Sequence, residues 1–113
     1  MKIETEILGA GLILKPVGRI DQTTAPAFQE RLLAALDSGQ DAAVALDLSE
    51  VDFLSSIGLR ALMIAHKQCQ TSGAKLVLFA LTPVVREVFA ISRFDTVLRC
   101  FEDRGAALSS LTA

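Results

Sequence analysis

Two adjacent serines, Ser55 and Ser56, are the residues of this sequence best placed to do chemistry. They follow a short apolar run, 42–48, and stand where a long segment with helical periodicity begins. Backbone N–H groups at a helix start lack partners and the helix dipole is positive there, so the position accepts negative charge, including phosphate. Phosphorylation would add about −1.5 to −2 charges at this point. Because serine is also a common helix cap, the residues alone leave two interpretations, a capping Ser55 and a phosphorylation switch.

Other patterns of catalytic and metal-binding residues do not occur in the sequence. His66 is the only histidine, and Cys69 and Cys100 lack the Cys-x-x-Cys spacing of a redox or zinc site. The sequence contains no Walker loop, no Gly-x-Gly-x-x-Gly and no Gly-x-Ser-x-Gly elbow. We therefore predict a protein that is not an enzyme and needs no metal or cofactor, with its two cysteines as buried thiols.

Acidic residues near the serines leave a cation site as an alternative. Carboxylates in loops more commonly form turns and cap helices, so we interpret these acids mainly in that way. The residues concerned are Asp21, Asp47, Glu50 and Asp52.

The charge balance and composition exclude several classes of partner. The chain has 11 basic and 13 acidic residues, a net charge of −2, which argues against nonspecific nucleic-acid binding. It lacks a run of about 18 apolar residues that could span a membrane. The N-terminus carries two acids and does not resemble a signal peptide. We expect one domain, residues 1–113, in the cytoplasm, with no nucleic-acid partner and no direct membrane insertion.

Hydrophobic periodicity predicts an α/β fold in which a hairpin precedes alternating strands and helices. The expected strands are 2–7, 11–20, 42–48, 75–80 and 96–101, with a turn at Gly9-Ala10-Gly11. Four helices are expected. The first runs from Thr23 or Thr24 to Asp37-Ser38-Gly39, the second from 56 to 71, the third from Thr82-Pro83 onward and the fourth from Glu102 onward. The packing face of the third helix comprises Val85, Val88, Phe89 and Ile91. This order indicates a mixed sheet covered by helices.

The predicted helix 56–71 has two faces. At about 100° per residue, its core face comprises Gly58, Leu59, Leu62, Ala65 and Cys69. Gly58 there would allow a close approach between helix and sheet. On the opposite side Ser56 lies with Arg60 and Lys67. Three apolar residues flank that side and are either a docking surface or covered by neighbouring elements: Ile57, Met63 and Ile64.

The sequence resembles the STAS family, named for sulfate transporters and anti-sigma factor antagonists. The resemblance is concentrated in 46–62, where a strand ends in Asp-hydrophobic-Ser and is followed by Ser-Ser-x-Gly-Leu. Gly18-Arg19-Ile20-Asp21 and the segment 73–78 are similar to two further family motifs. The resemblance implies a STAS-type mixed β-sheet, with an N-terminal hairpin and helices packed mainly on one face.

The resemblance also implies a function, that of an anti-sigma factor antagonist in a partner-switching cascade. Its partner would be an anti-sigma factor that is also a serine kinase of the histidine-kinase-like ATPase fold, and a PP2C-type phosphatase would reverse the phosphorylation. The phosphoacceptor of the family falls on Ser56, with Ser55 as the alternative. The expected partner-binding residues are Asp21, Ser55, Ile57, Arg60, Met63, Ile64 and Lys67. The alternative function is a cytoplasmic accessory subunit of a lipid or anion transporter.

Overall fold

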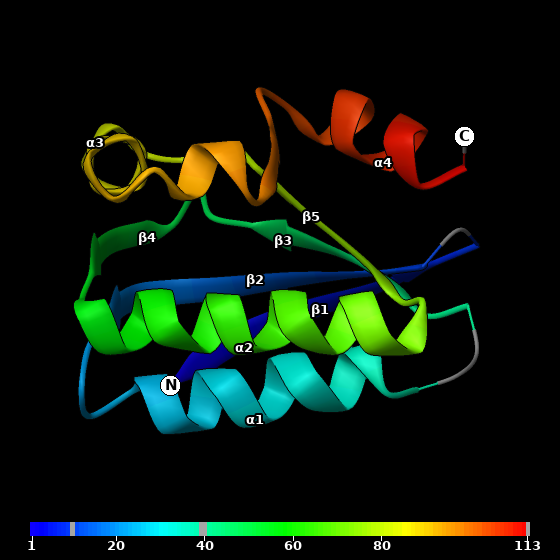
Figure 1. Cartoon of the computed structure of the whole chain (residues 1–113), viewed down its shortest axis with the longest axis horizontal. Coiled ribbons are helices and arrows are strands. Elements are labelled where there is room, and N and C mark those ends of the chain that lie inside the picture. Colours follow the sequence, from blue (N-terminus) through cyan, green and yellow to red (C-terminus); the bar gives the residue numbers. More distant parts are fainter. Residues whose placement is uncertain (10, 39–40, 113) are drawn as a thin grey trace.

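A mixed sheet lies between helices on both of its faces in the computed structural model, which describes residues 1–9, 11–38 and 41–112 (Figure 1). Helices α1 and α2 lie side by side against one face, and α4 covers part of the other (Figure 1). The elements in chain order are β1 (Lys2–Leu8), β2 (Gly11–Ile20), α1 (Ala25–Leu36), β3 (Ala43–Asp47), β4 (Val51–Leu54), α2 (Ser56–Ser72), β5 (Lys75–Phe79), α3 (Pro83–Ser92), the 3₁₀ helix η1 (Phe94–Thr96), β6 (Arg99–Phe101) and α4 (Arg104–Thr112). The predicted fold class, an α/β fold with a mixed sheet, an N-terminal hairpin and helical cover, is confirmed. The helices were expected mainly on one face, where α1 and α2 lie, and α4 adds cover on the other.

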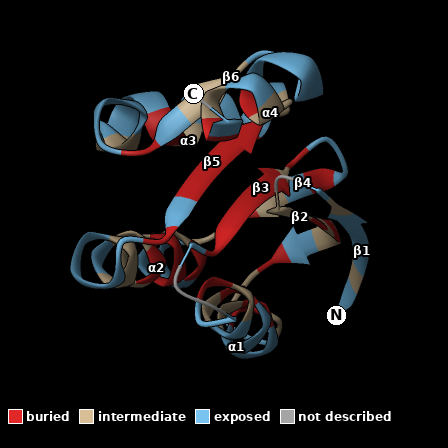
Figure 2. Cartoon of the chain, turned by 90° about the vertical axis from the view of Figure 1, so that its right-hand side faces the viewer, coloured by how far each residue is buried: buried red, intermediate tan, exposed pale blue. Residues whose placement is uncertain are grey.

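The sheet has six strands within the described residues, in the order β1-β2-β3-β5-β6, with β4 paired to β2. Strands β1 and β2 form the predicted antiparallel hairpin, in register from Lys2 opposite Val17 to Leu8 opposite Gly11. The remaining pairs are parallel. Figure 2 shows β3 and β5 buried and β1 largely exposed, because β1 lies at the sheet edge. A strand covered on both faces must be almost entirely apolar, as β3 is.

Two apolar clusters hold the layers together. The larger one packs α1, α2 and α3 against the sheet, with Phe28, Leu62 and Phe89 fully buried at its centre. The smaller one lies on the other face, where Ala107 and Leu111 of α4 cover Val77 and Phe79. No helix in the described part of the chain combines the length and apolarity needed to cross a membrane.

The structure differs from the sequence prediction in a few elements. Strand β4 was not expected, and the last strand is shorter than 96–101 because a 3₁₀ turn occupies residues 94–96. The prediction that Ile91 packs inward is wrong, because its side chain is 77% exposed and α3 buries Val85 and Phe89 instead. Ala10 of the predicted turn and Gly39 of the predicted helix end lie outside the described residues.

Candidate functional site

Three chain segments meet at the end of the sheet where β2 and β4 finish and α2 begins. The parallel pairing of β2 with β4 sets Arg19 opposite Phe53 and Ile20 opposite Leu54. The Ser55 N–H then donates to the Ile20 carbonyl at 2.9 Å, which ties the start of α2 to the end of β2. The sequence therefore brings the Gly18–Asp21 motif and the two serines to one edge.

Gly58 allows this close junction, as its position on the core face predicted. A Cβ atom at Gly58 would lie 2.6 Å from Leu54 Cδ1 and 2.8 Å from Ile20 Cγ2. Both distances are shorter than any ordinary contact between carbon atoms, so a side chain here would push α2 away from the strand ends. The glycine thus fixes how closely the serines approach Asp21.

The two serines have different roles in the structure. Ser55 is the N-cap of α2, with extended backbone angles, and its Oγ accepts a hydrogen bond from the Gly58 N–H at 3.3 Å. The capping interpretation of Ser55 is confirmed. Ser56 is the first residue of the helix and is exposed. Among the described residues, none forms a hydrogen bond with the Ser56 hydroxyl, which leaves it accessible to a second protein.

A pocket of about 360 Å³, open to solvent, adjoins Ser56. It lies between the β2–α1 connection, the end of β4 and the first turn of α2. The residues that line it are Arg19, Asp21, Gln22, Thr23, Phe53, Ser55, Ser56 and Ile57. Four of the predicted site residues therefore lie together here: Asp21, Ser55, Ser56 and Ile57.

Asp21 is held in the pocket by the turn that precedes α1. Its Oδ1 accepts hydrogen bonds from the N–H groups of Thr24, at 3.1 Å, and Thr23, at 2.9 Å. These two bonds, followed by the Thr24 hydroxyl and the charge of Arg19, lower the pKa of the Asp21 carboxyl. Asp21 is therefore ionised at neutral pH and fixed in place.

The cation site that the sequence left open has no support from this geometry. The described residues contain no group of three or more histidine, cysteine or acidic side chains able to hold a metal ion. Asp47 lies apart from the serines, lining a separate hollow together with Glu4, Glu6 and Arg104. Its Oδ1 accepts a hydrogen bond from the Ser49 N–H at 2.9 Å, which is the turn-forming role expected of a loop acid.

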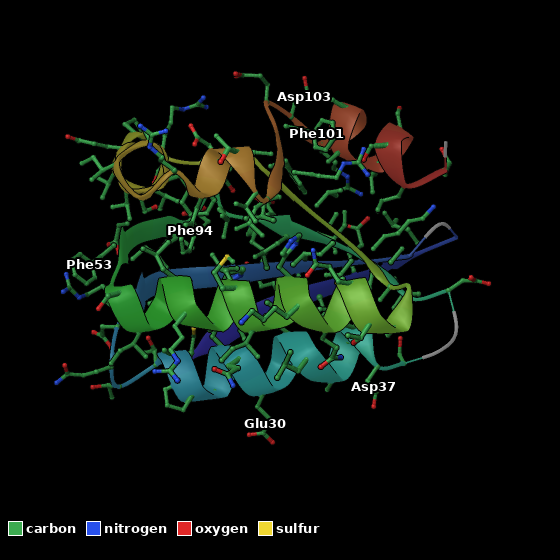
Figure 3. All side chains as sticks on the ribbon, viewed as in Figure 1. Glu30, Asp37, Phe53, Phe94, Phe101 and Asp103 are labelled. Atoms are coloured by element: carbon green, nitrogen blue, oxygen red, sulfur yellow. The ribbon has the colours of Figure 1, made fainter. Side chains whose placement is uncertain are left out.

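Arg19 and Phe53 belong to the site although the sequence analysis did not select them. The Arg19 guanidinium carbon lies 4.1 Å from the centre of the Phe53 ring, a cation–π contact. Its Nε lies 3.6 Å from Asp21 Oδ2. Phe53 projects from the end of the molecule where β4 leads into α2 (Figure 3). Both were missed because recognising them requires β4 and its pairing with β2.

The remaining predicted residues lie along α2 beyond the pocket. Arg60 and Lys67 are exposed, as the helical angles predicted, and Ile57 at the pocket margin is 46% exposed. Met63 and Ile64 are half-buried, so neighbouring elements cover them in part. The exposed side of α2 therefore carries two cations, Arg60 and Lys67, and the exposed apolar side chain of Ile57 beside Ser56.

Comparisons with known proteins identify relatives along almost the whole chain. The STAS domain family matches residues 2–107. A relative from Bordetella bronchiseptica, named “Putative anti-sigma factor antagonist BtrV”, is 34% identical over 110 residues, which are 97% of this chain and 94% of that protein.

Solved structures are similar to this chain in fold. TM1081 from Thermotoga maritima matches with a TM-score of 0.90 at 20% identity, covering 98% of this chain and 95% of that one. The phosphorylated form of the Bacillus cell fate determinant SpoIIAA matches with a TM-score of 0.70 at 14% identity, covering 93% of this chain and 96% of that one. At these identities the likeness establishes the fold alone.

Proposed function

The chain belongs to the STAS domain family and to its anti-sigma factor antagonists, and from this premise we propose that phosphorylation of Ser56 controls the binding of this protein to an anti-sigma factor. The partner is an anti-sigma factor that is also a serine kinase of the histidine-kinase-like ATPase fold. Unphosphorylated protein binds this partner and thereby frees the sigma factor, in the cytoplasm. A PP2C-type phosphatase returns the protein to its binding state.

The exposed hydroxyl of Ser56 is the observation that carries the proposal. A kinase needs an accessible oxygen, and Ser56 offers one while Ser55 is engaged in capping α2. In the transfer, Ser56 Oγ forms a bond to the γ-phosphorus of ATP and the bond to the β,γ-bridging oxygen breaks. ADP leaves, and the hydroxyl proton passes to a base of the kinase.

The surface around Ser56 supports a docking role. Ile57 is a large exposed apolar side chain at the pocket margin, and Arg60 and Lys67 lie on the exposed side of α2. We propose that these residues contact the partner, together with Ser55, Asp21 and the half-buried Met63 and Ile64. Interfaces commonly combine an apolar centre with a charged rim in this way.

A phosphate at Ser56 changes this surface more than the fold. The residue is exposed at the first position of α2, where the helix dipole favours negative charge. Against an acidic or apolar patch of a partner, the added charge costs desolvation and repulsion. A loss of about 3 kcal/mol would weaken binding more than a hundredfold.

Binding of an aspartate variant tests the switch. We expect Ser56→Asp to lose affinity for its anti-sigma kinase partner by about a hundredfold, measured by calorimetry, while its circular dichroism is unchanged. Ser109→Asp, at an exposed position on α4, adds the same charge elsewhere and should bind normally. If Ser56→Asp binds as tightly as the wild type, the switch is not at this residue.

Mass spectrometry identifies the modified residue directly. After incubation with the kinase and ATP, the phosphate should lie on Ser56, and Ser56→Ala should remain unmodified. Phosphate found on Ser55 alone would contradict the assignment, since phosphorylation there would require the capping hydroxyl.

A further inference from the structure

We propose that Arg19 binds the phosphate carried by Ser56 and leaves its present contact with Asp21 to do so. This inference rests on the proposed function in one respect only, that Ser56 carries a phosphate. Arg19 lies on β2 and Ser56 on α2, and both line the same pocket. The side chain of Arg19 would therefore act as a counter-ion inside the molecule for the modified serine.

The fold places Arg19 beside the serines through the pairing of β2 with β4. Arg19 is the register partner of Phe53, two residues before Ser55, and its guanidinium rests 4.1 Å from the Phe53 ring centre. The aromatic face supports the planar guanidinium and leaves its N–H edge directed to other partners. The cation is thus already in the pocket before any modification.

The present contact between Arg19 and Asp21 is weak enough to exchange. The Nε–Oδ2 distance of 3.6 Å is longer than a hydrogen bond, and the Arg19 side chain is 60% exposed. Asp21 does not depend on it, because the N–H groups of Thr23 and Thr24 already bind its Oδ1. A phosphate dianion offers several oxygens and accepts two N–H groups of one guanidinium at once, so it competes well for Arg19.

The charges lining the pocket also favour this exchange. The charged side chains among its lining residues are Arg19 and Asp21. Asp21 is ionised and fixed by the turn, so a phosphate on Ser56 would bring a second anion close to a carboxylate that cannot move away. Among the residues that line the pocket, Arg19 is the cation that can reduce the repulsion between the phosphate and the Asp21 carboxylate. Arg60, one turn along α2, is the competing candidate, but it does not line the pocket.

The test uses protein made with phosphoserine installed genetically at position 56, so that it requires no kinase. The second pKa of the phosphate is followed by ³¹P NMR. Removing a nearby cation disfavours the dianion, so we expect Arg19→Gln to raise this pKa by about half a unit. The matched control is Arg86→Gln on α3, which removes an arginine that is 57% exposed and paired with Glu102 away from the pocket.

A second measurement follows the guanidinium itself. The Arg19 Nε–H signal should shift on comparing the serine protein with the phosphoserine protein, and the Arg86 signal should not. An unchanged phosphate pKa in Arg19→Gln, with a shift in Arg60→Gln instead, would assign the phosphate to Arg60 and overturn the inference. Because the phosphoserine is encoded genetically, these results do not depend on whether a kinase modifies Ser56 or whether a partner is released.

Discussion

At the scale of single residues, the two serines lie in different environments that the residues alone could not distinguish. The Ser55 hydroxyl accepts a hydrogen bond from the Gly58 N–H, and Ser56 is exposed. We expect Ser55→Ala to lower the free energy of unfolding by about 0.5–2 kcal/mol, as loss of a helix cap does. Ser56→Ala should change it by less than about 0.5 kcal/mol, because the residue is on the surface. Urea unfolding of both variants measures the difference, and equal losses would contradict this expectation.

The sequence could predict part of the site, and the part it missed depends on long-range pairing. Ser55 and Ser56 stand out because hydroxyls before a helical segment are a local pattern, and Asp21 was selected because it ends a motif that resembles the STAS family. Arg19 and Phe53 carry no such local pattern. Their contact exists because β2 pairs with β4, and pairing between strands distant in the sequence is invisible to periodicity.

At the scale of elements, the same reasoning explains which strands and helices were predicted correctly. The parallel strand 43–47 begins with four buried apolar residues in a row, and α2 shows helical periodicity over several turns. Strand β4 has four residues, including an exposed Asp52, so it resembles a connecting loop in sequence. Ile91 was assigned to the core from its type, although it lies roughly 120° around α3 from Val85.

The junction between α2 and the strand ends gives a prediction at this scale. We expect Gly58→Ala to destabilise the protein by about 1–3 kcal/mol, because its Cβ would meet Leu54 and Ile20 at less than 3 Å. Gly105→Ala on α4 is the matched control, since its Cβ would meet only Asp103, at 3.5 Å. That change should stabilise the helix by up to about 1 kcal/mol. Thermal unfolding compares the two, and a neutral Gly58→Ala would show that α2 can shift freely.

At the scale of the whole molecule, titratable groups on separate elements define the pH range in which the fold is stable. The hydrogen bonds from Arg104 lower the pKa of Glu6, and those from Thr24 and Thr23 lower that of Asp21. These carboxylates stabilise the native state above their unfolded pKa values, near 4.5 and 3.8. Their contribution is lost as the pH falls through the lower native values.

The cysteines limit stability at the alkaline end. Burial, followed by the charge of Asp95, raises the pKa of the Cys100 thiol from 9.0 to about 11, and burial also raises that of Cys69. Both cysteines are half-buried, not fully buried as the sequence predicted. A partly buried neutral thiol favours the native state below the unfolded pKa of 9.0, and this contribution is lost as the pH rises through the native value. Stability should therefore be level between about pH 5 and pH 9 and fall on both sides.

The urea concentrations at the midpoint of unfolding, measured from pH 3 to pH 11, test how steeply stability falls at the acid and alkaline ends. Arg104→Gln should flatten the acid side, because Glu6 loses the partner that lowers its pKa. Cys100→Ala should flatten the alkaline side, because the thiol that resists ionisation is gone. The alanine variant also loses packing at every pH, but a packing loss lowers the whole curve without changing its slope. An alkaline slope that persists in both Cys100→Ala and the double variant with Cys69→Ala would show that other groups destabilise the fold at high pH.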